Sequence, residues 1–216
     1  MPEAAQRALT GKERPAILLL CSDGLTSEPL RSCIRAGAGR TAALIVTADP
    51  VYKEQNRHVP RCVAALQALS LSVDLFDLGR QPAAQLLQYD TVEFIGGNPY
   101  YMLHAIRLHR AEDALREIAR NQLLIGWSAA AFVFGPTLEL ADRYTPEMNT
   151  PGLTDLRALA LTDIHVLPHY SRFLRRFDRF EETCRDFERT HQVRVLRLND
   201  GDGCRIDGGC ISVIRG

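Results

Sequence analysis

Residues 123–131 read LLIGWSAAA, and this stretch decides the fold expected of the 216-residue chain. Three apolar residues, typical of the end of a buried strand, run into Gly126 and then into Ser128, with alanines behind it. Because glycine adopts backbone angles closed to other residues, and small side chains let a helix sit close to a strand, the stretch predicts a tight strand-to-helix turn. A serine at such a turn projects its hydroxyl above the edge of the sheet, near the first N–H groups of the helix.

The turn resembles a nucleophile elbow, whose common form is G-x-S-x-G. Ala130 stands at the second glycine position and departs from that form. These residues alone allow two interpretations of Ser128. It is a catalytic nucleophile, or it only caps the helix, a position that serine favours in many proteins.

Short apolar runs alternate with amphipathic segments around this turn. The expected strands are residues 15–21, 42–47, 72–76, 91–95 and 122–125. Helices are expected between them, including a continuous one over 99–119. Unbroken apolar runs of this length are typical of parallel strands covered on both faces, so the chain predicts an α/β fold with a mainly parallel sheet flanked by helices on both faces. The whole chain, residues 1–216, is expected to form one domain.

The second half of the chain is less regular. Strands are expected at residues 164–167 and 192–198, with a strongly charged helix at 177–190 between them. Asp207 and Gly208 stand between two apolar runs, a pattern that predicts a C-terminal β-hairpin.

The composition excludes several classes of function. Lys and Arg (26) balance Asp and Glu (26), so the net charge gives no reason to expect binding to nucleic acid or to a membrane. Six scattered cysteines without C-x-x-C or zinc-like spacing suit a reducing cytosol, and we expect no metal site.

No G-x-G-x-x-G follows the first strand, so no cofactor is expected. Without a signal peptide or a bilayer-spanning run, a cytoplasmic protein is expected, and a homodimer stays open.

Ligands of parallel sheets gather at the carboxyl ends of the strands. Three of these expected ends carry small or polar residues: SDG at 22–24, GGN at 96–98 and GWS at 126–128. The backbone N–H of Gly97, with that of Ala129, could bind an oxyanion near the serine. The alternative for the glycine pair is a tight turn only.

A serine hydroxyl becomes a nucleophile when a base removes its proton and a third group orients the base. Of six histidines, His169 follows the carboxyl end of an expected strand and is the candidate base, with a structural loop histidine as the alternative. Asp200 and Asp202 both follow the next strand, in a turn that aspartate favours in any case. Asp200 is preferred because it follows the strand more directly.

A family resemblance rests on five segments. They are IVTA at 45–48 with Tyr52 and Lys53, FIGGN at 94–98 followed by Leu103, GWSAAA at 126–131, PHY at 168–170 and LNDG at 198–201. Together they resemble the peptidase E group of serine peptidases, family S51, whose sheet is related to the class I glutamine amidotransferase fold. The order serine, histidine, acid is that of the family, whereas an α/β-hydrolase runs serine, acid, histidine.

The resemblance implies a catalytic triad. Ser128 would attack a carbonyl, His169 would transfer the proton, and Asp200 would hold the imidazole tautomer. Gly97 and Ala129 are the implied oxyanion donors. The best-known members carry glutamate where this chain has aspartate, so the aspartate two residues further on stays the second candidate.

The resemblance also implies a small peptide substrate. Typical members hydrolyse dipeptides that begin with aspartate, which requires a cationic pocket. No segment after His169 matches the specificity segment of the family, and the arginines there lie on a charged helix that is expected to face solvent. The substrate-binding residues stay unknown and an aspartate preference stays open. The alternative function is a binding or regulatory protein that keeps the fold without efficient turnover.

Overall fold

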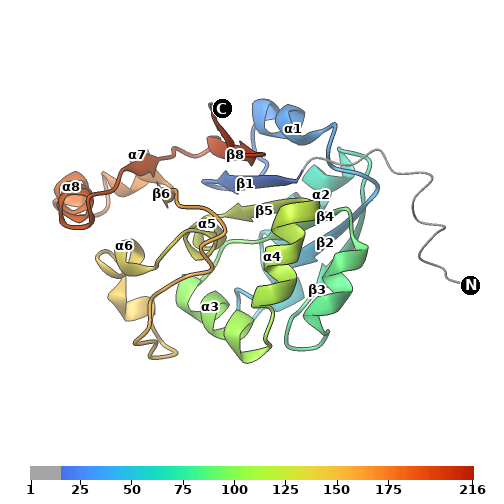
Figure 1. Cartoon of the computed structure of the whole chain (residues 1–216), viewed down its shortest axis with the longest axis horizontal. Coiled ribbons are helices and arrows are strands. Elements are labelled where there is room, and N and C mark those ends of the chain that lie inside the picture. The colour runs from blue at the N-terminus through green and yellow to red at the C-terminus, as the bar shows by residue number, and fades with distance from the viewer. Residues whose placement is uncertain (1–15) are drawn as a thin grey trace, which may run out of the picture.

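The computed structural model describes residues 16–216, and its centre is a seven-stranded sheet (Figure 1). The strand order is β3-β2-β4-β5-β1-β8-β9. The strands are β1 (Ile17–Cys21), β2 (Thr41–Ile45), β3 (Ser72–Phe76), β4 (Thr91–Phe94), β5 (Leu123–Trp127), β8 (Gly203–Asp207) and β9 (Cys210–Ile214). The first five are parallel, and the last two form an antiparallel hairpin at one edge. The expected mainly parallel sheet and C-terminal hairpin are confirmed.

Helices cover both faces of this sheet. On one face lie α1 (Glu28–Ile34) and α2 (Val59–Gln67), and on the other α3 (Pro99–Leu108), α4 (Glu112–Asn121) and α5 (Ala129–Phe134). Successive strand residues point to opposite faces, so Leu19 joins one apolar cluster and Leu20 the other. Both faces of β1, β2, β4 and β5 are therefore buried, which explains why β1 and β2 read as apolar runs, whereas the edge strand β3 is mostly exposed.

A smaller layer lies beside the main sheet. Its elements are α6 (Glu139–Asp142), β6 (His165–Leu167), α7 (Tyr170–Phe173), α8 (Phe180–His191) and β7 (Val195–Arg197). Strands β6 and β7 pair in parallel as a separate two-stranded sheet, with α8 to one side in Figure 1. In the described part of the chain, three short 3₁₀ helices lie in connections: η3 (Lys53–Gln55), η4 (Ala83–Gln88) and η5 (Pro146–Met148). Among residues 16–216, no helix has the length and apolarity that crossing a membrane requires.

The continuous helix expected over 99–119 is wrong. The structure has two helices there, α3 and α4, and the chain breaks at Arg110, whose φ is +52°. The N–H of Ala111 donates to the carbonyl of Ile106 at 2.9 Å, which closes the end of α3. Such ends usually carry glycine at the left-handed position. Because arginine stands there instead, nothing in the residue pattern indicates the break.

Strand β5 and helix α5 come very close to each other at Gly126. A Cβ atom at this position would lie 2.5 Å from the ring of Phe134. Gly126 is not among the residues with positive φ. The glycine is therefore needed for the close approach of helix and strand, and not for its backbone freedom.

We expect Gly126→Ala to lower the free energy of unfolding by about 1–3 kcal/mol, because the added methyl must displace a buried phenylalanine ring. Urea denaturation of the purified protein measures the change. Gly79→Ala is the matched control, since its Cβ would make only ordinary contacts, the nearest being 3.4 Å from Asp77 Oδ1. Equal stability of the two variants would contradict the steric account.

Candidate active site

The register of β5 aligns three loops at one edge of the main sheet. Strand β5 pairs with β1 on one side and with β4 on the other. Cys21 is level with Trp127, and Phe94 is level with Gly126. All three strands therefore end at nearly the same height, and the residues that follow them share one edge, as expected for parallel strands.

Ser128 begins α5 in a strained conformation. Its φ is +54° and its ψ is −110°, a region that non-glycine residues rarely adopt. Its N–H donates to the carbonyl of Cys21 at 3.1 Å, and its carbonyl accepts from the N–H of Ala131 at 3.1 Å. These backbone hydrogen bonds to β1 and α5 hold Ser128 at the turn between strand and helix.

The two-stranded sheet brings His169 and Asp200 together. Leu167 in β6 is level with Arg197 in β7, and two backbone hydrogen bonds of 3.0 Å continue the pairing through Leu198. His169 follows β6 by two residues and Asp200 follows β7 by three. Since the strands are parallel, their following residues meet at one end.

Ser128, His169 and Asp200 form a continuous hydrogen-bonded series. His169 Nε2 lies 2.9 Å from Ser128 Oγ, and His169 Nδ1 lies 2.5 Å from Asp200 Oδ1. These distances bring together the three residues singled out in the sequence. A hydroxyl, an imidazole and a carboxylate in this order can transfer a proton away from the serine.

Ser22, the residue after β1, forms hydrogen bonds with both His169 and Asp200. Its Oγ accepts a hydrogen bond from the backbone N–H of His169 at 2.8 Å and donates to Asp200 Oδ1 at 2.9 Å. The side chain is fully buried. Sequence reasoning placed Ser22 at a strand end but assigned it no role, because its partners lie 147 and 178 residues away in the chain.

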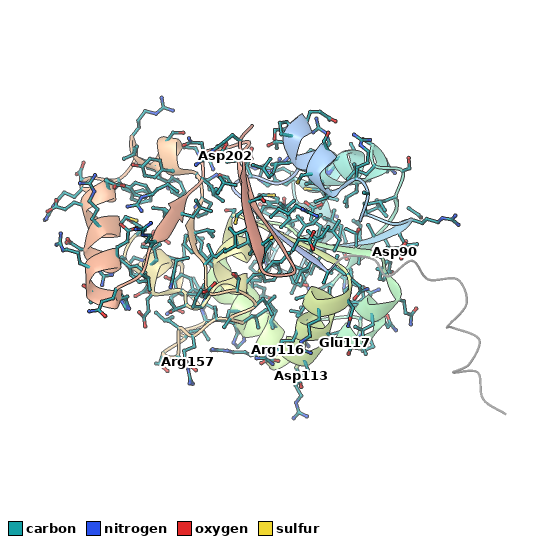
Figure 2. All side chains as sticks on the ribbon, turned by 45° about the horizontal axis from the view of Figure 1, so that its top comes forward. Asp90, Asp113, Arg116, Glu117, Arg157 and Asp202 are labelled. Carbon is teal, nitrogen blue, oxygen red and sulfur yellow. The ribbon has the colours of Figure 1, made fainter. Side chains whose placement is uncertain are left out.

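The other candidate acid, Asp202, has different partners. Its carboxylate accepts from Arg215 Nη1 at 2.6 Å and from the backbone N–H groups of Asn199 and Gly216 at 3.1 Å. It is 4 % exposed, and Figure 2 shows it beside the C-terminal hairpin. Asp202 therefore fixes the end of the chain, while Asp200 contacts the imidazole.

Burial and hydrogen bonding set the charges of the histidine–aspartate pair. Burial lowers the pKa of His169, and the neighbouring Asp200 only partly opposes it, so the net pKa lies below the ordinary value. Burial raises the pKa of Asp200, but its hydrogen bond with His169 and the nearby positive charges outweigh this effect and hold the pKa low. At neutral pH His169 is a neutral base beside an ionised carboxylate.

Gly97 and Ala129, the expected oxyanion donors, both line a cavity that opens onto Ser128. In the described part of the chain, neither backbone N–H donates to a protein acceptor. A Cβ at Gly97 would lie 2.8 Å from the carbonyl oxygen of Ala48, so the bend of this loop requires glycine. Two uncommitted donors thus stand at the same cavity as the serine.

Two cavities meet at Ser128 and His169. One, of about 490 Å³, extends over α5 and α6 and is largely apolar. The other, of about 450 Å³, is lined by Arg57, Arg61 and Arg172 together with carboxylates that are already hydrogen-bonded. Among residues 16–216, no acidic side chain forms an ion pair with Arg57 or Arg61. This cationic cavity can therefore accept an anionic group.

Trp127 lines the cationic cavity and forms a hydrogen bond with a buried acid. The guanidinium of Arg61 lies 4.8 Å from the centre of the indole ring, and the indole N–H donates to Glu93 Oε1 at 3.1 Å. Burial raises the pKa of Glu93 to about 7, although the indole N–H and Arg61 act in the opposite direction. Sequence reasoning missed this acid because it stands inside a strand that otherwise reads as core.

No group of three or more His, Cys, Asp and Glu side chains within residues 16–216 is arranged to hold a metal ion. All six cysteines are free thiols.

We expect Glu93→Gln to change how stability depends on pH. Because the pKa of Glu93 is raised from 4.5 to about 7 by folding, its contribution is fully present below pH 4.5 and is lost as the pH rises to 7. The free energy of unfolding of the unmodified protein should fall by about 3 kcal/mol relative to the variant over this interval. Chemical denaturation at several pH values measures the difference, and parallel curves would contradict the raised pKa.

Comparisons with known proteins identify a family and several relatives of this chain. The sequence profile of peptidase family S51 matches residues 18–214. An uncharacterized peptidase of Listeria monocytogenes is 30% identical over 138 residues, which cover 62% of this chain and 67% of that protein. Peptidase E of Streptomyces coelicolor is 27% identical over 160 residues, covering 72% of this chain and 64% of that protein.

Two solved structures share the fold. The crystal structure of a candidate peptidase E from Listeria monocytogenes superposes with a TM-score of 0.75 at 25% identity, covering 93% of this chain and 98% of that one. The structure of a peptidase from an acI-B1 actinobacterium gives a TM-score of 0.68 at 14% identity, covering 94% of this chain and 89% of that one. The similarity extends over nearly all the described residues.

Proposed function

This chain belongs to peptidase family S51 and is a serine peptidase, and we propose that it hydrolyses small peptides through Ser128, His169 and Asp200. The observation that carries the proposal is the hydrogen-bonded series from the serine hydroxyl through the imidazole to the carboxylate. In this reaction His169 removes the proton of Ser128 as the hydroxyl attacks the peptide carbonyl. It then returns the proton to the leaving amine, and a water molecule that gives its proton to the same imidazole cleaves the acyl-enzyme, releases the acid product and restores the Ser128 hydroxyl.

Gly97 and Ala129 supply the oxyanion donors in this proposal. Their uncommitted N–H groups would bind the oxygen of the tetrahedral intermediate, where one such donor contributes about 3–4 kcal/mol in other enzymes. Asp200 keeps the proton of the imidazole on Nδ1, so that Nε2 faces the serine as an acceptor. Ser22 is a positioning residue, because it holds the backbone of His169 and the carboxylate together.

The cationic cavity supports a short substrate. Arg57 and Arg61 can bind a carboxylate, and in a dipeptide the C-terminal carboxylate always lies within one residue of the scissile bond. An aspartate side chain would carry the same group. A preference for aspartate at the first position therefore has to be measured against other peptides that also end in a carboxylate.

We expect a fluorophosphonate probe to label the unmodified protein at Ser128. Ser128→Ala should abolish labelling, and His169→Ala should remove most of it, because the hydroxyl then lacks its base. Asp200→Asn should slow labelling at least a hundredfold, since the imidazole loses the partner that fixes its tautomer. Asp202→Asn is the matched control and should change stability more than labelling. A folded protein that the probe does not label would favour a binding or regulatory function instead.

We also expect the rate of labelling or of hydrolysis to fall at acid pH with a midpoint below 6.5. Only the neutral imidazole can accept the proton, and burial holds the pKa of His169 below 6.5. The neutral, basic form of His169 therefore persists to a lower pH than that of a free histidine. A midpoint above pH 7 in the dependence of kcat/KM on pH would contradict the stated environment of His169.

A further inference from the structure

The larger of the two cavities is walled mainly by apolar and aromatic side chains. Its lining includes Phe132 of α5, Tyr144 after α6, Met148 of η5 and Phe173 of α7, and it reaches both Ser128 and His169. Its volume of about 490 Å³ lies in the range of sites that take small molecules. Most of its lining residues belong to the irregular second half of the chain.

Contacts with other parts of the protein fix the aromatic side chains that line this cavity. The hydroxyl of Tyr144 donates to the carbonyl of Phe180 at 2.8 Å, so it is committed to the protein and not to a ligand. The ring of Phe173 lies 5.3 Å from that of Phe177 and 5.4 Å from the imidazole of His169. Phe132 packs against two of the apolar clusters. These contacts keep the wall in shape when no ligand is bound.

The charges around the apolar cavity are all of one sign. Arg57, Arg172 and Arg176 line it, and the guanidinium groups of Arg172 and Arg176 each lie over a phenylalanine ring. Within the described part of the chain, no carboxylate lines this cavity. A basic side chain would therefore meet positive charge without a partner. A small side chain would leave most of the apolar wall in contact with water, which is unfavourable.

We infer that this apolar cavity is the subsite for a large apolar or aromatic side chain of the residue on one side of the scissile bond. The inference rests on the proposed peptidase function and names its substrate class. The carboxylate of the same peptide would then occupy the cationic cavity on the other side of Ser128. The substrate is a short peptide with one bulky apolar residue.

A panel of dipeptides tests the subsite. Ala-Ala is compared with Phe-Ala and with Ala-Phe, so that the bulky residue is offered on each side of the bond in turn, and Asp-Ala is included. We expect kcat/KM to be at least tenfold higher for one of the phenylalanine peptides than for Ala-Ala, because a benzyl group buries far more apolar surface than a methyl group.

Filling the cavity gives an independent test. Met148→Trp should bring the ratio of kcat/KM between the preferred phenylalanine peptide and Ala-Ala close to one, because the indole occupies the space for the side chain. Leu108→Trp is the matched control. It adds the same group at an exposed position at the far end of α3 and should keep the preference of the unmodified protein. Thermal unfolding and fluorophosphonate labelling of both variants report whether fold and site are intact.

The outcomes separate the two proposals. Cleavage that depends on Ser128 but favours Ala-Ala or Asp-Ala, or that shows no preference, overturns the apolar subsite and leaves the peptidase mechanism standing. A protein that neither cleaves nor reacts with the probe overturns both. If the probe reacts but no dipeptide is cleaved, the test is whether each dipeptide slows labelling of Ser128 by the probe. Stronger protection by a phenylalanine peptide supports the subsite, and equal protection by Ala-Ala overturns it.

Discussion

The site depends on the parallel pairing of β5 between β1 and β4. Backbone hydrogen bonds fix the relative heights of the three strands, and this register alone decides which loop residues become neighbours. Ser22 and Ser128 belong to adjacent strand ends although they are more than a hundred residues apart in the chain. A register shift of one residue would turn each following side chain toward the opposite face. The positions of Ser128 and of its surroundings therefore follow from the sheet.

Much of the fold could be predicted because its signals are local. Each buried parallel strand is a short apolar run, and the strand-to-helix turn at Ser128 requires small residues behind it. The break at Arg110 could not be predicted, since arginine takes a position where glycine would have given the signal. The role of Gly126 was predicted for the wrong reason. The structure requires its missing side chain, and the positive φ falls on Ser128.

Some residues of the candidate site could be predicted from the sequence and others could not. Ser128, His169 and Asp200 each stand at a strand end in a recognisable segment, so the sequence pointed to them. Ser22, Arg57 and Arg61 carry no such pattern, because their importance arises only when distant elements pack together. The apolar cavity was invisible for another reason: its phenylalanines read as ordinary core residues. The catalytic roles, the single domain over 1–216 and the homodimer stay predictions.

The three members of the hydrogen-bonded series belong to two different sheets. Ser128 is carried by the main sheet, whereas His169 and Asp200 follow the small sheet of β6 and β7 and are fastened to β1 through one hydroxyl. The main sheet therefore positions Ser128 but not its two partners in the hydrogen-bonded series, which follow it by 41 and 72 residues in the chain. A chain that lacked the segment from β6 onward would keep the serine and lose both partners.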